Sequence, residues 1–459
     1  MGVDIERYVE QERARFLDEL AAFLAIPSVS SSSAHRADVE RCARFIADHL
    51  RGIGFQRVDV LPTGGHPVVY AEWLGRPGKP TALIYGHYDV QPTDPEHLWE
   101  SPPFQASVRD GAIFARGAAD DKGQVFMHWK ALEAYFRLHD GPPVNIKLLI
   151  EGEEEVGSAH LDAFVETHRD LLSADVAVVS DTSMFRQGLP SIVYGLRGIA
   201  YFEVEVVGPK RDLHSGVYGG AVANPIQVLC ELIARVKDEK GRVAIPGFYD
   251  DVRPLTAQER AEFARLPFDE EAYRRDLGVV QLAGEEGYTT LERVWARPSF
   301  DPNGIWGGFT GEGSKTVLPS RAAAKVSFRL VPDQDPNRVA DLFETYLHRL
   351  CPPSVSLSIK RMHVGKPVLT PLDHPAVQAA SRALERGFQR RPVFIREGGS
   401  IPVVATLQDV LKLPTLLVGV ASPDAHIHAP NERLELENLW GGIRSVYYLW
   451  QELAALPRA

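Results

Sequence analysis

The sequence predicts an α/β protein in which a mostly parallel sheet flanked by helices is interrupted by a smaller α+β sandwich. Three observations lead to this fold class. Strand and helix patterns alternate along residues 1–194, the rhythm then changes, and the alternation returns near residue 374. We therefore expect a discontinuous catalytic domain, residues 1–194 plus 366–459, and a second domain at 195–365.

Apolar residues at three- and four-residue spacing, or in short continuous runs, define the elements of the discontinuous domain. The first helix carries Tyr8, Phe16 and Phe23 at this spacing and ends before Pro27. Strands that alternate with helices are typical of a parallel sheet covered on both faces. The expected elements are helices at 5–24, 39–50, 123–138, 160–172, 375–388 and 436–453, and strands at 58–61, 67–73, 81–86, 144–150, 175–180, 393–396 and 415–420.

The second domain shows two strand–helix units separated by a long insertion. Residues 241–315, between the two units, are rich in Pro, Gly and acidic residues. This pattern indicates a small α+β sandwich. Its expected elements are strands at 199–207, 322–331 and 355–361 and helices at 224–240 and 336–350.

Composition excludes several classes of protein. Lys and Arg total 50 against 61 Asp and Glu, a net charge of −11, which disfavours binding to nucleic acid or to an anionic membrane. No run of 18 apolar residues is present, so we expect no spanning helix. The three cysteines, Cys42, Cys230 and Cys351, are far apart and odd in number, and the N-terminus lacks the apolar segment of a secretion signal. We therefore expect a cytoplasmic protein.

Acidic residues and histidines follow the ends of several predicted strands. In an open α/β sheet, ligands bind at this edge. A run of glutamates directly after a buried strand is costly unless cations neutralise it or protons are retained. The residues concerned are His87, Asp89, Asp120, Asp121, the run Glu151-Gly-Glu153-Glu154-Glu155, Asp181, His426 and His428.

Each of these residues also has an ordinary structural explanation. Asp89 and Asp181 are compatible with turns, Asp120 or Asp121 with a helix cap, and the histidines with the surface. Together, however, two histidines and three carboxylate positions supply the N and O ligands that Zn, Mn or Co take. Two such ions clamp a carbonyl and lower the pKa of a water. The combination favours a two-metal hydrolase with a spare glutamate as general base.

Seven segments, in the same order along the chain, resemble those of the M20 metallopeptidases. The resemblance is closest to the cytosolic dipeptidase and carnosinase-like branch and extends from Phe16 to the last helix. The segments are His87-Tyr-Asp89-Val-Gln91-Pro92, Arg116-Gly-Ala-Ala-Asp120-Asp121-Lys122-Gly123, Glu151-Gly-Glu153-Glu154-Glu155-Val-Gly-Ser158, Asp212-Leu-His214-Ser-Gly-Val-Tyr-Gly-Gly220, Phe328-Arg329-Leu-Val-Pro332, Arg396-Glu-Gly-Gly-Ser400-Ile-Pro402 and His428-Ala-Pro-Asn-Glu432.

The resemblance implies a site for two divalent metal ions per subunit, zinc or manganese, with cobalt possible. Asp89 would orient a ligand histidine, and Glu154 would be the general base. The implied ligands are His87 and Asp181 for one ion, Glu155 and His428 for the other, and Asp120 as the bridge.

Two details of this assignment stay open in the sequence. Asp121 stands where the family usually has Asn, and in the family the peptide bond before this residue is typically cis. The tail carries two histidines. The adjacent Asn431-Glu432 aligns His428 with the ligand, whereas a slip in register would select His426.

The family's smaller domain serves as a lid and dimerisation module, so the resemblance implies a homodimer. His214 would reach the partner subunit's active site and stabilise the oxyanion, and Arg329 would bind the substrate's terminal carboxylate. Thr316, His363 and Ser400 resemble further substrate-contacting positions.

The function that this implies is hydrolysis of dipeptides with a free C-terminal carboxylate. One alternative is a deacylase for N-acyl amino acids, which Arg329 does not separate from a dipeptidase because both substrates bear the carboxylate. The other is a non-catalytic, metal-stabilised dimeric binding protein. The intact Glu154–Glu155 pair disfavours this last alternative.

Overall fold

A computed structural model describes residues 4–399 and 401–457, and the chain forms two compact units. Unit 1 contains residues 4–194, 370–395 and 402–457; unit 2 contains 195–369, 396–399 and 401. Unit 2 thus includes residues 366–369, 396–399 and 401, which the sequence pattern placed in the discontinuous domain. Pairing explains the first difference, because Val368 and Leu369 lie beside Leu196 and Gly195.

The sheet of unit 1 has the order β1-β2-β6-β3-β7-β17-β8. Its central strands β6, β3, β7 and β17 are parallel, as expected, and the α/β fold class is confirmed. The outer pairs β1–β2, β2–β6 and β17–β8 are antiparallel, so the sheet is mixed. Residues 62–67 between β1 and β2 are too few for the crossover that parallel neighbours need. The strands are β1 (Arg57–Leu61), β2 (Val68–Trp73), β3 (Thr81–His87), β6 (Asn145–Glu151), β7 (Val176–Val179), β8 (Ser191–Leu196), β16 (Val393–Glu397), which pairs with β8, and β17 (Thr415–Leu417).

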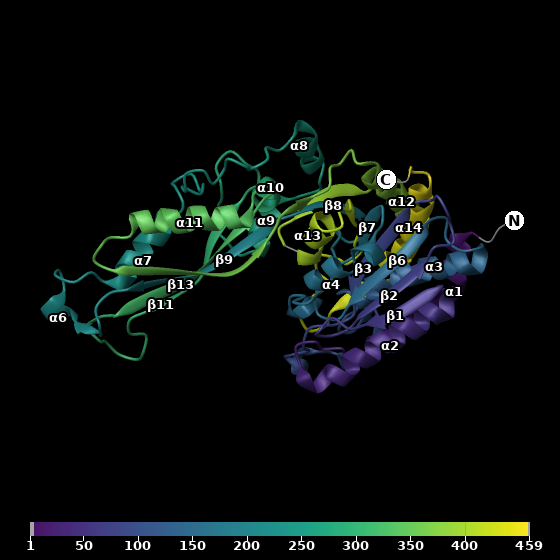
Figure 1. The fold of residues 1–459 in the computed structure, drawn as a ribbon, viewed down its shortest axis with the longest axis horizontal. Coiled ribbons are helices and arrows are strands. Elements are labelled where there is room, and N and C mark those ends of the chain that lie inside the picture. The colour runs from purple at the N-terminus through teal and green to yellow at the C-terminus, as the bar shows by residue number, and fades with distance from the viewer. Residues whose placement is uncertain (1–3, 400, 458–459) are drawn as a thin grey trace. The chain divides into compact units, whose positions relative to one another are not determined.

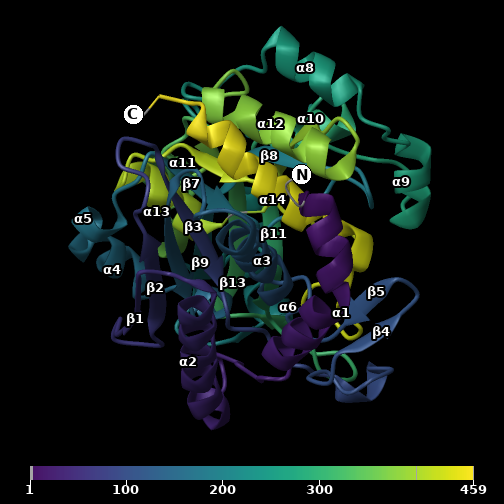
Figure 2. The ribbon, with the colours of Figure 1, turned by 90° about the vertical axis from the view of Figure 1, so that its right-hand side faces the viewer.

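Helices cover both faces of this sheet, as Figure 2 shows most directly. The expected helix at 160–172 is split at His168 into α4 and α5. Within residues 4–399 and 401–457, no helix is both long and apolar enough to cross a membrane. One layer contains α1 (Ile5–Leu24), α2 (Arg36–Ile53), α3 (Lys122–Leu138), α12 (Pro375–Phe388) and α14 (Leu436–Ala454); the other contains α4 (Leu161–Thr167), α5 (Arg169–Leu172) and α13 (Pro402–Asp409). Short 3-10 turns are η1 (Ser33–His35), η2 (Glu96–Leu98) and η3 (Glu154–Val156).

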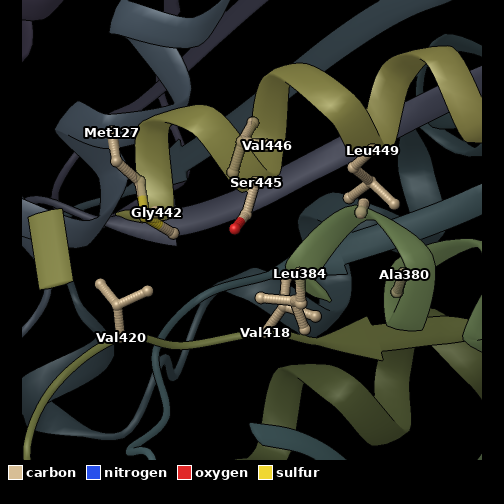
Figure 3. A pocket seen from close by; sticks show the side chains of 10 residues that line it. Met127, Ala380, Leu384, Val418, Val420, Gly442, Ser445, Val446 and Leu449 are labelled. Carbon is tan, nitrogen blue, oxygen red and sulfur yellow. The ribbon is translucent and has the colours of Figure 1, made fainter. Parts of the chain in front are cut away.

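Helix α3 is buried over most of its length because α1, α2 and α14 pack on it and it also contacts β3. Between α3, α12 and α14 the apolar side chains leave a cavity of about 10 Å³, into which the Ser445 hydroxyl projects (Figure 3). Its lining includes Met127, Leu384 and Val420 and no charged residue. This gap is at most the size of one water molecule, so it is a packing defect and not a ligand site.

A small sheet of order β18-β5-β4 joins two distant parts of unit 1. Its strands are β4 (Ser107–Arg109), β5 (Ala112–Phe114) and β18 (Arg433–Glu435). The antiparallel pairing of β5 with β18 brings the loop before Asp120 next to the loop that carries His428.

Unit 2 is an antiparallel sheet of order β11-β13-β9-β14 with α7 and α11 on one face (Figure 1). In β9 every second residue is buried, and Phe202 and Val204 pack against Phe328 and Phe343 in the core. The unit is the α+β sandwich predicted from the sequence. Its main elements are β9 (Gly198–Val207), α7 (Pro225–Ala234), β11 (Ser299–Gly307), β13 (Arg321–Leu330), α11 (Pro336–Leu350) and β14 (Ser356–Gly365).

The insertion at 241–315 is more ordered than its composition indicated. It contains three short helices and the edge strand β11. Thr256 and Thr289 each begin a helix with a capping box, a signal that lies in the sequence but outside any apolar pattern. The expected helix at 224–240 ends at Ala234, and Lys237 instead bridges to Val243. The remaining elements are β10 (Leu213–His214), α6 (Ser215–Tyr218), α8 (Ala257–Ala264), α9 (Glu270–Asp276), α10 (Thr290–Ala296), β12 (Val317–Leu318) and β15 (Val368–Leu369).

Candidate metal centre

The ends of the parallel strands bring candidate ligands together in unit 1. Strand β3 ends at His87, β6 ends at Glu151, which is the first residue of the glutamate run, and Asp181 lies two residues beyond β7. Asp120 comes from the loop that leads into α3, where Gly123 is required because a Cβ there would lie 1.9 Å from the carbonyl oxygen of Ala118. His428 lies on the loop between β17 and β18.

The first group of possible ligands is His87, Asp120 and Asp181. His87 Nε2 lies 3.0 Å from Asp120 Oδ1 and 3.8 Å from Asp181 Oδ2, and the His87 side chain is fully buried. Its other ring nitrogen, Nδ1, is 3.1 Å from the backbone carbonyl oxygen of Asp89 and 3.4 Å from Asp89 Oδ1. These contacts fix the ring so that Nε2 faces the two carboxylates.

The second group is Asp120, Glu155 and His428. His428 Nε2 lies 2.8 Å from Asp120 Oδ2 and 3.1 Å from Glu155 Oε2. The two oxygens of Asp120 therefore face two different histidines, which is the arrangement expected of a bridging carboxylate. His426 is exposed, and its Nδ1 faces the carbonyl oxygen of Pro430 at 3.3 Å, so His428 and not His426 lies in the group.

The backbone around these ligands has two notable features. The Asp120–Asp121 peptide bond is cis, and Asp121 Oδ2 accepts a hydrogen bond from the His87 N–H at 3.2 Å. The carboxylate of Asp89 accepts from the N–H groups of Glu154 at 3.2 Å and Glu155 at 3.1 Å. Asp89 thus holds the glutamate turn as well as the His87 ring.

Glu154 lies beside these ligands and has an altered acidity. Burial raises the pKa of Glu154 to about 7, and the charges of Asp120 and Glu155 act in the same direction while His87 opposes them. A carboxyl group with a pKa near neutrality is suited to take up and return a proton.

The electrostatics of the group favour bound cations. Hydrogen bonds to Asp120 and Glu155 raise the pKa of His428 to about 10. Burial, with the charge of Asp120, raises the pKa of Asp181 well above its ordinary range. Protons thus compensate the clustered carboxylates, and divalent ions can replace those protons. The donor set of imidazole nitrogens and carboxylate oxygens also fits such ions.

A third group of His and Glu side chains, Glu19, His49 and Glu133, does not fit a metal ion. The ammonium group of Lys130 already lies among them, bonded to Glu19, 2.7 Å from Glu133 Oε2 and 3.2 Å from His49 Nε2. This internal cation satisfies the carboxylates, so the cluster ties α1, α2 and α3 together.

Four other predicted site residues belong to unit 2. His214 is exposed at the end of β10, and its Nδ1 accepts from the Gly216 N–H at 3.0 Å. The carbonyl oxygen of the exposed Thr316 accepts from the Ser215 N–H. Arg329 lies on β13, and His363 on β14 stacks on Tyr201 with ring centroids 5.3 Å apart. Ser400 lies outside the described residues, and the roles of all five stay predictions.

Two residues for which the sequence predicted no role contact the candidate ligands. Gln91 Nε2 donates to Glu155 Oε2 at 2.8 Å and to the Glu155 carbonyl oxygen at 3.2 Å. The carboxylate of Glu432 accepts from the N–H of Asp120. Both residues stand inside segments that carry the family resemblance, which was the available signal.

Comparison with known proteins places the chain in a family. Residues 83–452 match Peptidase family M20/M25/M40. The chain belongs to this family. The resemblance seen in the sequence is thereby confirmed, and so is the prediction that the protein is a metallopeptidase.

Members of the M20 family resemble this chain over nearly its whole length. The Cys-Gly metallodipeptidase dug1 of Schizosaccharomyces pombe is 33% identical over 98% of this chain and 97% of its own. The Beta-Ala-His dipeptidase of Homo sapiens is 32% identical over 98% and 92%. Among solved structures, the M20 family metallo-carboxypeptidase Sso-CP2 of Sulfolobus solfataricus has a TM-score of 0.85 and 32% identity, covering 96% of this chain and 99% of its own.

Proposed function

We propose that this M20 protein hydrolyses dipeptides that carry a free C-terminal carboxylate, with two divalent metal ions per subunit. The observation that carries the proposal is the position of Asp120, whose two oxygens each face the histidine of a separate group of ligands. The proposed ligands are His87 and Asp181 on one side, Glu155 and His428 on the other, and Asp120 between them.

The chain's own residues divide the chemical work. Bound divalent ions supply the Lewis acidity that polarises the scissile carbonyl and lowers the pKa of a water molecule. Glu154 accepts the proton of the attacking water and returns it to the leaving amine, as a general base and then a general acid. Asp89 fixes the backbone of Glu154 and the ring of His87, so base and ligand keep their positions.

Residues outside the group of metal ligands supply the substrate contacts in this proposal. Arg329 binds the terminal carboxylate, and Thr316, His363 and Ser400 make further contacts. The protein forms a homodimer through unit 2, and His214 stabilises the oxyanion in the partner subunit's active site.

The names of the relatives favour dipeptides over N-acyl amino acids, because they include dipeptidases for Cys-Gly and for β-Ala-His. The physiological ion in our proposal is zinc or manganese, with cobalt as a substitute. A cytoplasmic location stays a prediction of the sequence.

The test combines elemental analysis with an assay on Cys-Gly, β-Ala-His, Ala-Ala and N-acetyl-alanine. We expect two ions per subunit and cleavage of at least one dipeptide that stops when a chelator removes the ions. Faster cleavage of N-acetyl-alanine would establish the deacylase instead. A protein that binds stoichiometric ions but cleaves none of the four would be the binding protein, and one that binds no ions would overturn the proposal.

Glu154→Gln separates the base from the ligands. We expect this variant to keep both ions and to lose about 100- to 10,000-fold in kcat, because the isosteric amide cannot accept the proton. Glu153→Gln is the matched control, since Glu153 is the neighbouring buried glutamate and its carboxylate faces His160 Nδ1 at 2.9 Å. Equal losses of kcat in the two variants would show that Glu154 is not the general base.

A further inference from the structure

Glu432 has an unusual set of partners for a carboxylate. Its side chain is fully buried, and four N–H groups converge on its two oxygens. Oε1 accepts from the backbone N–H of Ala119 at 2.9 Å and of Asp120 at 3.0 Å. Oε2 accepts from the backbone N–H of Gly117 at 3.0 Å and from the Arg116 guanidinium at 2.6 Å.

These bonds join the loops that supply two of the three ligands of the second group, Asp120 and His428. Three of the four donors are the backbone N–H groups of Gly117, Ala119 and Asp120. The bonds therefore hold the backbone of the loop as far as Asp120 itself. The backbone carbonyl of Glu432 also accepts from the Ala115 N–H at 3.1 Å, so both backbone and side chain hold the same loop. Four residues before Glu432 on its own loop stands His428, whose Nε2 faces Asp120 Oδ2.

We propose that Glu432 is a positioning residue. It holds the backbone of the Asp120 loop against the His428 loop and so keeps the carboxylate of Asp120 facing the ring of His428. The inference rests on the proposed function, since it assumes that Asp120 and His428 bind metal ions. Glu432 does not touch substrate in this role and acts through Asp120.

The chemistry of the four partners explains why a glutamate is needed. All four are donors, so both side-chain oxygens must act as acceptors. A glutamine has the same shape but only one acceptor oxygen, and its NH2 group would face two N–H donors. Glu432→Gln thus preserves packing while removing half of the bonds that hold the loop.

Glu435 offers a matched control three residues further along the chain. It is also a buried glutamate, but its carboxylate binds other partners: Oε2 accepts from Ser422 Oγ at 2.7 Å and Oε1 accepts from Arg433 Nε at 3.3 Å. Glu435→Gln therefore reports the general cost of neutralising a buried carboxylate in this region.

The experiment measures binding of Mn²⁺ and Zn²⁺ at buffered free-ion concentrations, together with the absorption spectrum of the Co²⁺-loaded protein. We expect Glu432→Gln to bind ions about 10- to 100-fold more weakly than wild type and to change the Co²⁺ spectrum, which reports ligand geometry and not overall stability. Glu435→Gln should retain the wild-type affinity and spectrum even where its melting temperature falls.

The outcomes separate this inference from the proposed function. If wild type binds no ions, the proposed function fails. If wild type binds two ions and Glu432→Gln binds them with the same affinity and spectrum, the positioning role is wrong. Equal weakening in both variants also overturns it. Should Glu432→Gln not fold, Glu432→Asp decides, because its shorter carboxylate keeps the charge but not the reach: weaker binding supports the inference, and unchanged binding refutes it.

Discussion

The two halves of the candidate metal centre share Asp120 but are held in different ways. In the strand half, His87 is the last residue of β3 and pairs with Glu151 of β6, so the parallel sheet holds its backbone directly. Asp181 lies two residues beyond the end of β7, close to the same sheet. In the loop half, Glu155 belongs to a 3-10 turn and His428 to a loop, with the His428 side chain 52% exposed.

Because of this difference, the ligands of the loop half must be held in place by contacts other than sheet hydrogen bonds. Asp89 and Gln91 hold Glu155, and Glu432 holds the Asp120 loop, all through side-chain hydrogen bonds. Ligands on sheet elements are more precisely placed than ligands on loops. We therefore expect the strand half to bind its ion more tightly, and the variants below test whether the halves are separable.

Asp120→Ala should have the largest effect, because it removes the one residue that both halves share. We expect both ions to be lost and activity to fall at least about 1,000-fold, which corresponds to about 4 kcal/mol of lost transition-state stabilisation. Elemental analysis and the dipeptide assay measure the two effects. Asp48→Ala, which removes an exposed aspartate on α2, is the control that should keep both ions. A variant that kept one ion at wild-type affinity would show that one half of the centre binds its ion without Asp120.

The strand half could largely be predicted from the sequence, whereas the supports of the loop half could not. The apolar run of β3 locates His87 at its end, because strand limits follow from local hydrophobic pattern. The bonds from Glu432 to the Asp120 loop span more than 300 residues, and no local pattern records them. Gln91 was visible only as part of a family-like segment.

The same contrast applies to the fold. The four central strands of unit 1 are mostly apolar and were assigned correctly to a parallel sheet. Strand β11 was missed because Asp301, Pro302 and Gly304 interrupt its pattern and most of its residues are not buried. An edge strand gains its order from its partner, here β13, and the sequence does not show that these two strands pair.

Acid should destabilise the scaffold of the strand half through His128. This buried histidine on α3 has Nε2 2.7 Å from Ser180 Oγ, next to Asp181, and burial lowers the pKa of His128 from 6.5 to about 3. Since the folded pKa is the lower one, the unfolded chain takes up the proton first as pH falls below 6.5. Stability is therefore lost between pH 6.5 and 3, and by pH 5 the loss is about 2 kcal/mol relative to pH 7.

Urea unfolding of the metal-free protein at pH 7 and pH 5 measures this loss. His128→Gln keeps a polar group near Ser180 but cannot titrate, so its free energy of unfolding should fall by about 2 kcal/mol less than that of wild type. An identical fall in both proteins would show that His128 does not link the strand half to acid.

Gln91→Ala should give the smallest effect and the sharpest separation of the two halves. The amide of Gln91 holds only Glu155, through bonds of 2.8 Å to its carboxylate and 3.2 Å to its backbone carbonyl. Loss of these bonds should cost about 1 kcal/mol of binding free energy for one ion, which corresponds to about fivefold weaker binding. The affinity for the other ion should not change. Calorimetric titration with Mn²⁺ resolves the two events if their affinities differ as we expect. Gln378→Ala is the matched control, because Gln378 also donates to a backbone carbonyl, that of Leu372, but on α12. Equal weakening of both ions in Gln91→Ala would mean that the halves are coupled through Asp120 and respond as one site.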